Sequence, residues 1–246
     1  RGFRLFLHTA ARFFSGRGMG LLLAFFLILS MLIATASRAG SLAAAAGFLA
    51  IVALAIIRKG VRAVSRWSYA GALAIALLMG LAFLSYGDSL MDRFDGLVET
   101  DMLDRGNGRL LFWTAAERMI NDAPLLGLGL GTFEPSFPMY AGKMLPYIVD
   151  KAHNDYLELM AGWGLPAAIS WLAAMTWCGV LCMRGYFVRH RRRIYPLIGA
   201  GAAALVAFHS AFDFSLQIPA VALTFAVILG LGLAQAFPTR PGRKWQ

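Results

Sequence analysis

The sequence predicts an all-α protein, a polytopic bundle of transmembrane helices, and three observations lead to this fold class. Charged residues make up only 15% of the 246 residues, against about 25% in soluble domains, and 59% are hydrophobic. Six uncharged runs are each 19 to 26 residues long, and about 20 apolar residues cross a bilayer as a helix. Every second charged segment along the chain carries three to five cations and no acid. This pattern excludes a soluble globular enzyme.

The runs divide the chain into three parts. Residues 1–87 are expected to hold three transmembrane helices with basic cytoplasmic loops. Residues 88–152 form an outer loop with helical segments, and residues 153–246 an outer amphipathic helix followed by three further transmembrane helices. Because the chain begins Arg1-Gly2-Phe3, we expect further spans upstream. The six runs comprise residues 18–37, 39–57, 67–87, 159–183, 194–212 and 214–239.

The distribution of charge predicts the orientation of the bundle. Both terminal segments and the segments 58–66 and 184–193 carry only cations, whereas residues 88–151 carry ten acids and six cations. Short basic loops remain in the cytoplasm. The long acidic segment, Arg38 and Asp213 are therefore expected outside. The net charge of +10 needs no nucleic acid to explain it.

The outer loop contains two sequence patterns that are typical of helices. Residues 107–121 place Arg109, Phe112 and Trp113 on one face of a 3.6-residue period, and residues 150–160 place His153 on a second amphipathic helix. The glycine-rich residues 125–132 predict a turn. Residues 133–147 contain three prolines and are expected to be irregular.

Few polar side chains stand at the outer ends of the spans, and these are the candidate functional residues. Arg38 is an isolated cation on a short outer turn, where it either has a function or extends to the lipid head groups. Histidine side chains can accept a proton near neutral pH, and His153 is either a base or a hydrogen-bonded interfacial histidine. His209 and Asp213 lie four residues apart and can pair with each other to stabilise the bundle. The spacing of these groups predicts no metal site.

The run Gly127-Leu128-Gly129-Leu130-Gly131 is a weak nucleotide-binding signal, because its spacing is not G-x-G-x-x-G and no βαβ pattern surrounds it. Two interpretations remain open. In the first, the glycine-rich run is a flexible turn. In the second, it is a turn whose backbone amides face a phosphate group, and Gly129 supplies one of these amides.

Four segments together resemble the O-antigen ligase and Wzy-type polymerase superfamily, in its C-terminal portion. The matching segments are Ser37-Arg38-Ala39-Gly40, the run from Arg109-Leu-Leu-Phe-Trp113 to Gly131-Thr132-Phe133, Ala152-His153-Asn154-Asp155-Tyr156-Leu157 with Gly164-Leu165-Pro166, and His209-Ser210-Ala211-Phe212-Asp213-Phe214 with Gln217-Ile218-Pro219-Ala220. Ala39 and Ala167 replace glycines that are common in the family.

The resemblance implies a glycosyltransferase that moves a glycan from an undecaprenyl pyrophosphate carrier to an acceptor hydroxyl, on the periplasmic side of the bacterial inner membrane. It assigns catalysis to Arg38, Arg109 and His153. Asn154, Trp113, Gly129 and Asp213 are further candidates for substrate contact. The acceptor is a saccharide or lipid A-core.

The implied chemistry needs countercharge and a base. Arginine offers a planar fork of donors to phosphate oxygens, and fixed cations stabilise the charge that develops on the leaving pyrophosphate. Histidine removes the acceptor proton. We therefore expect an inverting, metal-independent reaction without a cofactor. The alternative is a non-enzymatic transporter or lipid-phosphate-binding component of an envelope glycan pathway, although a transporter would place polar groups at the membrane midplane.

Overall fold

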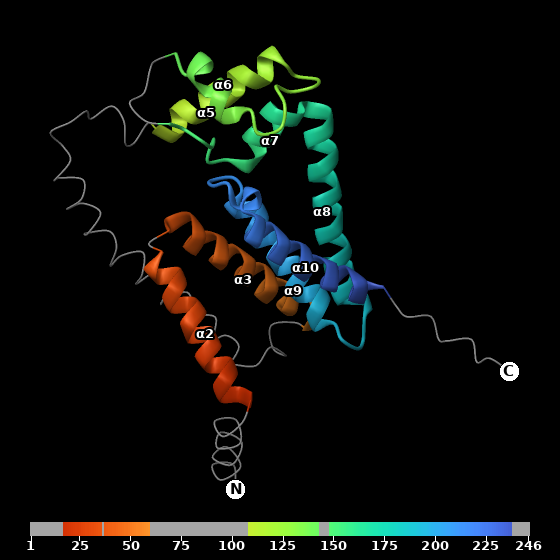
Figure 1. Cartoon of the computed structure of the whole chain (residues 1–246). Helices are drawn as coiled ribbons and strands as arrows, with labels where there is room; N and C mark the ends of the chain where they lie inside the picture. The colour runs from red at the N-terminus through yellow and green to blue at the C-terminus, as the bar shows by residue number, and fades with distance from the viewer. Residues whose placement is uncertain (1–16, 36, 60–107, 143–147, 238–246) are drawn as a thin grey trace, which may run out of the picture.

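The computed structural model describes residues 17–35, 37–59, 108–142 and 148–237 (Figure 1). Every regular element in these ranges is a helix, which confirms the predicted all-α class. The elements are α2 (Arg17–Ala34), α3 (Arg38–Lys59), α5 (Gly108–Asp122), α6 (Phe133–Tyr140), α7 (Asp155–Trp163), α8 (Leu165–Val188), α9 (Ile194–His209), the 3-10 helix η2 (Ser215–Gln217) and α10 (Pro219–Ala236).

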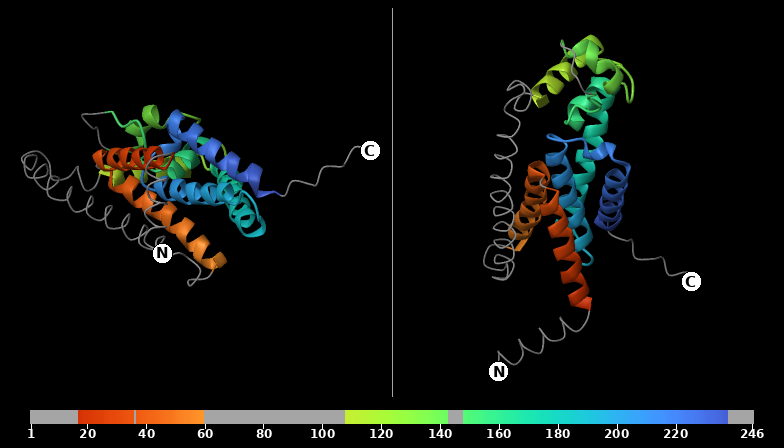
Figure 2. Two further views of the ribbon diagram at one scale, coloured as in Figure 1. Left: turned by 90° about the horizontal axis from the view of Figure 1, so that it is seen from below. Right: turned by 60° about the vertical axis from the view of Figure 1, so that its left-hand side comes forward.

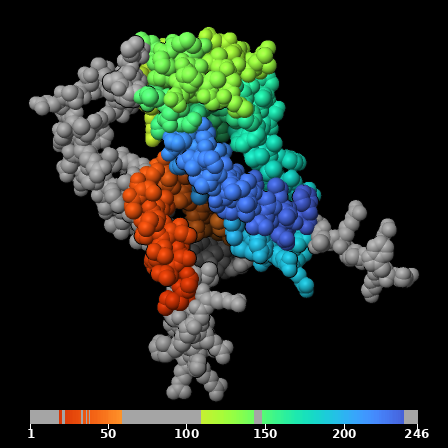
Figure 3. Space-filling view, in the orientation of Figure 1, coloured from red at the N-terminus to blue at the C-terminus, as the bar shows by residue number. Residues whose placement is uncertain are grey.

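The helices form two layers. The lower layer is a bundle in which α9 packs against α3, α8 and α10, and α2 contacts α3. The upper layer, which we call the cap, consists of α5, α6 and α7 and lies over one end of the bundle, as the right-hand view of Figure 2 also shows. In the space-filling view the cap covers the end at which α8 begins (Figure 3).

Three helices of the described chain are long and apolar enough to cross a membrane: Ala39–Arg58, Leu165–Val188 and Pro219–Ala236. Leu23–Leu32 and Ile194–His209 are apolar but shorter. The predicted run 67–87 lies outside the described residues. A membrane-type helical bundle is therefore confirmed, whereas the expected number of about six spans is not.

Small residues let the bundle helices approach closely. A Cβ atom on Gly199 of α9 would lie 3.2 Å from the Cα of Gly232 on α10 and 3.0 Å from Sγ of Cys182 on α8. Cys182 is fully buried among these helices. Three helices thus meet at a point where two of them lack side chains, a device common in membrane bundles.

The end of the bundle opposite the cap is basic. Arg58, near the end of α3, donates from Nη1 to the carbonyls of Phe187 (3.2 Å) and Arg189 (3.3 Å) and to that of Tyr186, and its guanidinium lies 5.2 Å from the centre of the Tyr186 ring. A cation at this point satisfies carbonyls that the end of α8 leaves free and interacts favourably with the helix dipole. The remaining basic side chains of residues 189–193 lie at the same end.

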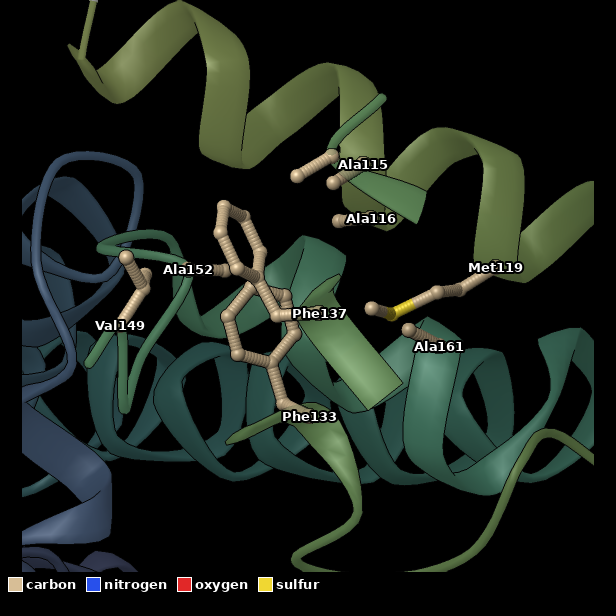
Figure 4. Packing of buried hydrophobic residues seen from close by; sticks show 9 residues of the cluster. Ala115, Ala116, Met119, Phe133, Phe137, Val149, Ala152 and Ala161 are labelled. Carbon is tan, nitrogen blue, oxygen red and sulfur yellow. The ribbon is translucent and has the colours of Figure 1, made fainter. Parts of the chain in front are cut away.

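The cap has a hydrophobic core of its own. Figure 4 shows Phe133 and Phe137 of α6 beside Ala115 and Ala116 of α5 and Ala161 of α7, all of them buried. The prediction of an irregular segment over residues 133–147 is therefore wrong for 133–140. The two phenylalanines lie four residues apart and share the buried face of α6. Their burial outweighs the hydrogen bond that Pro138 removes inside the helix.

Candidate functional site

His153 lies at the junction of the cap and the bundle, immediately before α7. The predicted helix over 150–160 begins only at Asp155, and this part of the prediction is wrong. Asn154 caps α7, since its Oδ1 accepts from the backbone N–H groups of Tyr156 (3.0 Å) and Leu157 (3.1 Å). His153 has a φ of 51°, which is a left-handed conformation that breaks the helix.

Two aromatic rings hold the imidazole of His153. It stacks on Phe112 of α5, with ring centres 6.0 Å apart and an interplanar angle of 25°. Phe214 meets it edge to face at 5.0 Å and 71°. One third of the His153 side chain, 33%, is exposed. The ring is therefore fixed in orientation yet accessible to a substrate.

Asp213 lies between two imidazoles. Its Oδ1 is 3.4 Å from Nδ1 of His153, and its Oδ2 is 4.0 Å from Nε2 of His209. Both are ion-pair distances, and neither nitrogen forms a hydrogen bond with the described residues. His209 also forms a hydrogen bond through Nδ1 with the hydroxyl of Ser215. The predicted pair of His209 and Asp213 is present. The approach of Asp213 to His153 was not predicted, because it joins segments that are distant in the sequence.

Asp155 is a further residue of this region that sequence reasoning missed. Its carboxylate is buried and accepts from the hydroxyl of Ser210 (2.8 Å), the N–H of Leu216 (3.2 Å) and the amide of Gln217 (3.4 Å). Burial raises the pKa of Asp155, and these hydrogen bonds offset part of the effect. Its backbone N–H donates to the carbonyls of Ser210 and Asp213. Asp155 thus fastens the start of α7 to the segment that carries Asp213.

Two of the expected substrate contacts have their polar groups engaged in the fold. The Asn154 amide donates to the carbonyl of Ala211 at 3.1 Å, in addition to capping α7. The Gly129 N–H donates to the carbonyl of Gly162 at 3.0 Å, and the N–H of Leu128 donates to the carbonyl of Ala161 at 2.9 Å. The glycine-rich turn therefore docks against the end of α7.

The remaining candidates lie on two helices, Arg109 and Trp113 on α5 and Arg38 on α3. Arg109 is exposed in the first turn of α5, one turn before Phe112. Trp113 follows, and its indole N–H is buried without an acceptor among the described residues. Arg38 is the first residue of α3. Because Arg58 of the same helix lies at the basic end, Arg38 begins α3 at the cap end.

An apolar groove runs below this region between the bundle helices. It has a volume of about 620 Å³ and is lined by residues of α3, α8 and α9, among them Ala53, Met175 and Ala203. Its upper end reaches Tyr156 and Ser210. Within the described ranges, no group of three or more His, Cys, Asp or Glu side chains is placed to hold a metal ion.

The protein-family model described as O-antigen ligase (Wzy_C) matches residues 23–172, which is more than half of the chain and includes Arg38, Arg109 and His153. No curated protein and no solved structure matches the chain.

Proposed function

The chain belongs to the O-antigen ligase family, and we propose that it is the catalytic part of a membrane glycosyltransferase of the ligase or polymerase type. The donor is a glycan linked to undecaprenyl pyrophosphate. The acceptor is a hydroxyl of a saccharide or of lipid A-core. The family supports the membrane glycan function in general, and the mechanism proposed below rests on the geometry around His153.

One observation carries the mechanism: Asp213 lies 3.4 Å from Nδ1 of a histidine that two aromatic rings hold in place. A carboxylate at Nδ1 favours the tautomer in which Nδ1 carries the proton and leaves Nε2 free to accept one. His153 Nε2 then takes the proton of the acceptor hydroxyl as its oxygen bonds to the anomeric carbon. Asp213 stabilises the imidazolium that forms.

The same step breaks the bond between the anomeric carbon and the pyrophosphate oxygen, which leaves with the electron pair. Arg38 and Arg109 are proposed to bind the pyrophosphate, because a guanidinium matches phosphate oxygens with a fork of donors. Their fixed charge stabilises the leaving group without a metal ion. Pyrophosphate is a good leaving group and needs no general acid. A single displacement of this kind inverts the anomeric carbon.

The architecture supports an active site at the outer membrane boundary. The cationic side chains of Arg58 and residues 189–193 lie at one end of the bundle, which the positive-inside rule assigns to the cytoplasm. His153, Asp213 and the start of α5 lie at the other end. This arrangement corresponds to the periplasmic side of the inner membrane. The polyprenyl chain of the donor would lie between apolar helices.

In this assignment Asn154 and Gly129 contribute by holding the start and the end of α7. Trp113 is proposed as a substrate contact on the α5 face that presents Phe112 to His153. Its buried indole N–H is a donor that a glycan hydroxyl can satisfy.

The test is transfer in vitro by the full-length protein in proteoliposomes, with a defined undecaprenyl-pyrophosphate glycan and candidate acceptors. We expect product in excess chelator and inversion at the new linkage. Binding of the donor without transfer to any acceptor would contradict the enzyme and favour the non-enzymatic lipid-phosphate-binding alternative. Strict restoration by Mg²⁺ after chelation would contradict the role of the arginines.

A further inference from the structure

A second hollow lies beside α7, apart from the imidazole of His153. This head cavity has a volume of about 260 Å³ and lies between α7, the first turns of α8, η2 and the turn at residues 130–131. His153 and the residues around it, Phe112, Phe214 and Asp213, are not among the lining residues. Asp155 lines the cavity, and its backbone N–H donates to the carbonyl of Asp213. The head cavity therefore adjoins the proposed active site without being part of it.

The walls of the head cavity combine aromatic rings with hydrogen-bond acceptors. Trp163 and Trp171 lie with their ring centres 6.4 Å apart and their planes at 77°. The buried carboxylates of Asp155 and Glu158 line the same space. No lysine or arginine is among the described residues that line it. Glu158 is paired with Lys151, whose Nζ lies 3.5 Å from Oε1, and its Oε2 accepts from the N–H of Ala152 at 2.8 Å. The carboxylate of Asp155 has no such cation among the described residues that line the cavity, so it disfavours a phosphate group and favours a ligand that donates hydrogen bonds.

Some hydrogen-bonding capacity of these walls is unused. Oδ1 of Asp155 accepts only the long bond of 3.4 Å from Gln217 among the described residues, although a carboxylate oxygen has two acceptor sites. A ligand that donates a hydrogen bond to this carboxylate oxygen, as a hydroxyl group does, would use this capacity.

The size and the exit of the head cavity restrict the ligand further. Sites for drug-sized ligands have volumes of about 300–1,000 Å³, and the volume of the head cavity is smaller. A cavity of this size suits a single sugar ring. The cavity and the apolar groove share five lining residues, so the two are adjacent: Tyr156, Trp171, Leu172, Ser210 and Leu216. A sugar ring with an apolar chain attached matches both spaces. The C–H face of the ring can pack on the tryptophans, its hydroxyls can donate to the hydrogen-bond acceptors of the walls, and its chain can lie in the groove.

We propose that the head cavity is a saccharide subsite that holds one sugar ring of a membrane-anchored acceptor glycolipid. This inference rests on the proposed glycosyltransferase function. The acceptor is favoured over the donor because the donor carries a pyrophosphate, and the cavity offers it the carboxylate of Asp155 and no lining lysine or arginine among the described residues. An in-line displacement also needs the acceptor and the leaving group on opposite faces of the anomeric carbon.

The binding test uses octyl glucoside with a photoreactive diazirine in the alkyl chain and octyl phosphate with the same group as control. Both are added to the full-length protein in nanodiscs, and labelled peptides are identified by mass spectrometry. We expect octyl glucoside to label the groove residues beside which its alkyl chain lies, among them Leu172 and Met175, and octyl phosphate to label them at least about tenfold less. Trp171→Ala should lower the labelling about tenfold, which is about 1.4 kcal/mol. Trp177→Ala, on the same helix but 62% exposed and outside the cavity, should leave it unchanged.

Trp163→Phe provides a second variant that keeps one aromatic ring and removes the other ring of the indole. It should lower labelling about fivefold, because part of the aromatic surface that contacts the sugar is lost. Equal labelling by the glucoside and phosphate probes, or full labelling of both tryptophan variants, would overturn the saccharide subsite. In transfer assays, Trp171→Ala should raise KM for the acceptor about tenfold and leave KM for the donor unchanged.

The failures of the two proposals are distinguishable. An unchanged acceptor KM in Trp171→Ala would overturn the assignment of the cavity to the acceptor. Specific labelling by octyl glucoside in a protein that transfers no glycan would overturn the enzymatic function together with the acceptor role, and would leave a sugar-binding cavity. Labelling needs no turnover and is therefore independent of His153.

Discussion

Nδ1 of His153 and Oδ1 of Asp213 lie 3.4 Å apart, although 60 positions separate the two residues in the sequence. Asp155 fixes this approach, because its backbone N–H donates to the carbonyl of Asp213 and its carboxylate accepts from Ser210 and Leu216. A helix start in the cap is thus tied to the turn between α9 and α10. The histidine therefore has a defined partner for its imidazolium form.

Replacement of that partner should impair catalysis more than binding. Asp213→Asn keeps the size of the side chain and removes its charge, so the imidazolium of His153 loses its stabilisation. We expect kcat to fall by about 10²-fold, the lower limit of what a general base contributes, with KM for the donor nearly unchanged. Steady-state transfer measures both. Ser215→Ala, which removes only the partner of His209 Nδ1, is the control and should retain most activity.

The arginines should tolerate no exchange for lysine. Arg38→Lys and Arg109→Lys keep the charge but lose the planar fork of donors. We expect each to lower kcat/KM about 10²–10³-fold, as the loss of one transition-state donor does. Arg118→Lys on the same helix as Arg109 is the control, because Arg118 donates to the carbonyl of Tyr140 in the cap. Near-normal transfer by both test variants would contradict a role of the planar fork. Arg38 and Arg109 would then contribute only their charge.

Asp155 predicts a pH dependence of stability. Because burial raises the pKa of Asp155 from its ordinary value of 3.8, folding favours its protonated form. The contribution of this protonation to the stability of the fold is fully present below pH 3.8 and is lost as the pH rises through the raised pKa of Asp155. Asp155→Asn resembles the protonated form, so its melting temperature relative to the wild type should rise as the pH increases from below 3.8 through the raised pKa of Asp155. Asp150→Asn, at an exposed position, is the control; a constant difference for Asp155→Asn would contradict the account.

The glycine-rich turn predicts a difference between two glycines of similar conformation. Gly127 and Gly131 have φ values of 66° and 72°, so alanine is strained at both, by about 1–2 kcal/mol. A Cβ on Gly127 would lie 2.4 Å from the carbonyl oxygen of Gly162, whereas one on Gly131 meets nothing within 4 Å. Thermal unfolding should therefore show a larger loss for Gly127→Ala than for Gly131→Ala. Equal losses would show that the turn does not dock on α7.

The sequence predicted those parts of the fold that depend on local pattern. The predicted helix over 107–121 is α5, Gly108–Asp122, because its apolar period and its end signals are local. The predicted turn before Phe133 is present for the same reason. Composition was enough to predict a membrane-type bundle.

The errors and omissions have tertiary causes. Pro135 and Pro138 suggested an irregular segment, but the burial of Phe133 and Phe137 against α5 and α7 stabilises α6. The start of α7 was placed too early, since its cap depends on the side chain of Asn154 and on the left-handed φ of His153. Asp155 was missed because its partners lie about 55 to 62 positions away in the sequence, and no local pattern shows such contacts.

The measurement that tests the central claim most directly is single-turnover transfer by His153→Gln, with donor binding determined separately. Glutamine keeps hydrogen-bonding capacity but cannot accept a proton from the acceptor hydroxyl. If His153 is the base, the variant should bind the undecaprenyl-pyrophosphate glycan like the wild type, since the arginines bind the pyrophosphate, and its transfer rate should fall about 10²–10⁴-fold. A transfer rate near that of the wild type would contradict the role of His153 as the base. His153 would then only orient the acceptor.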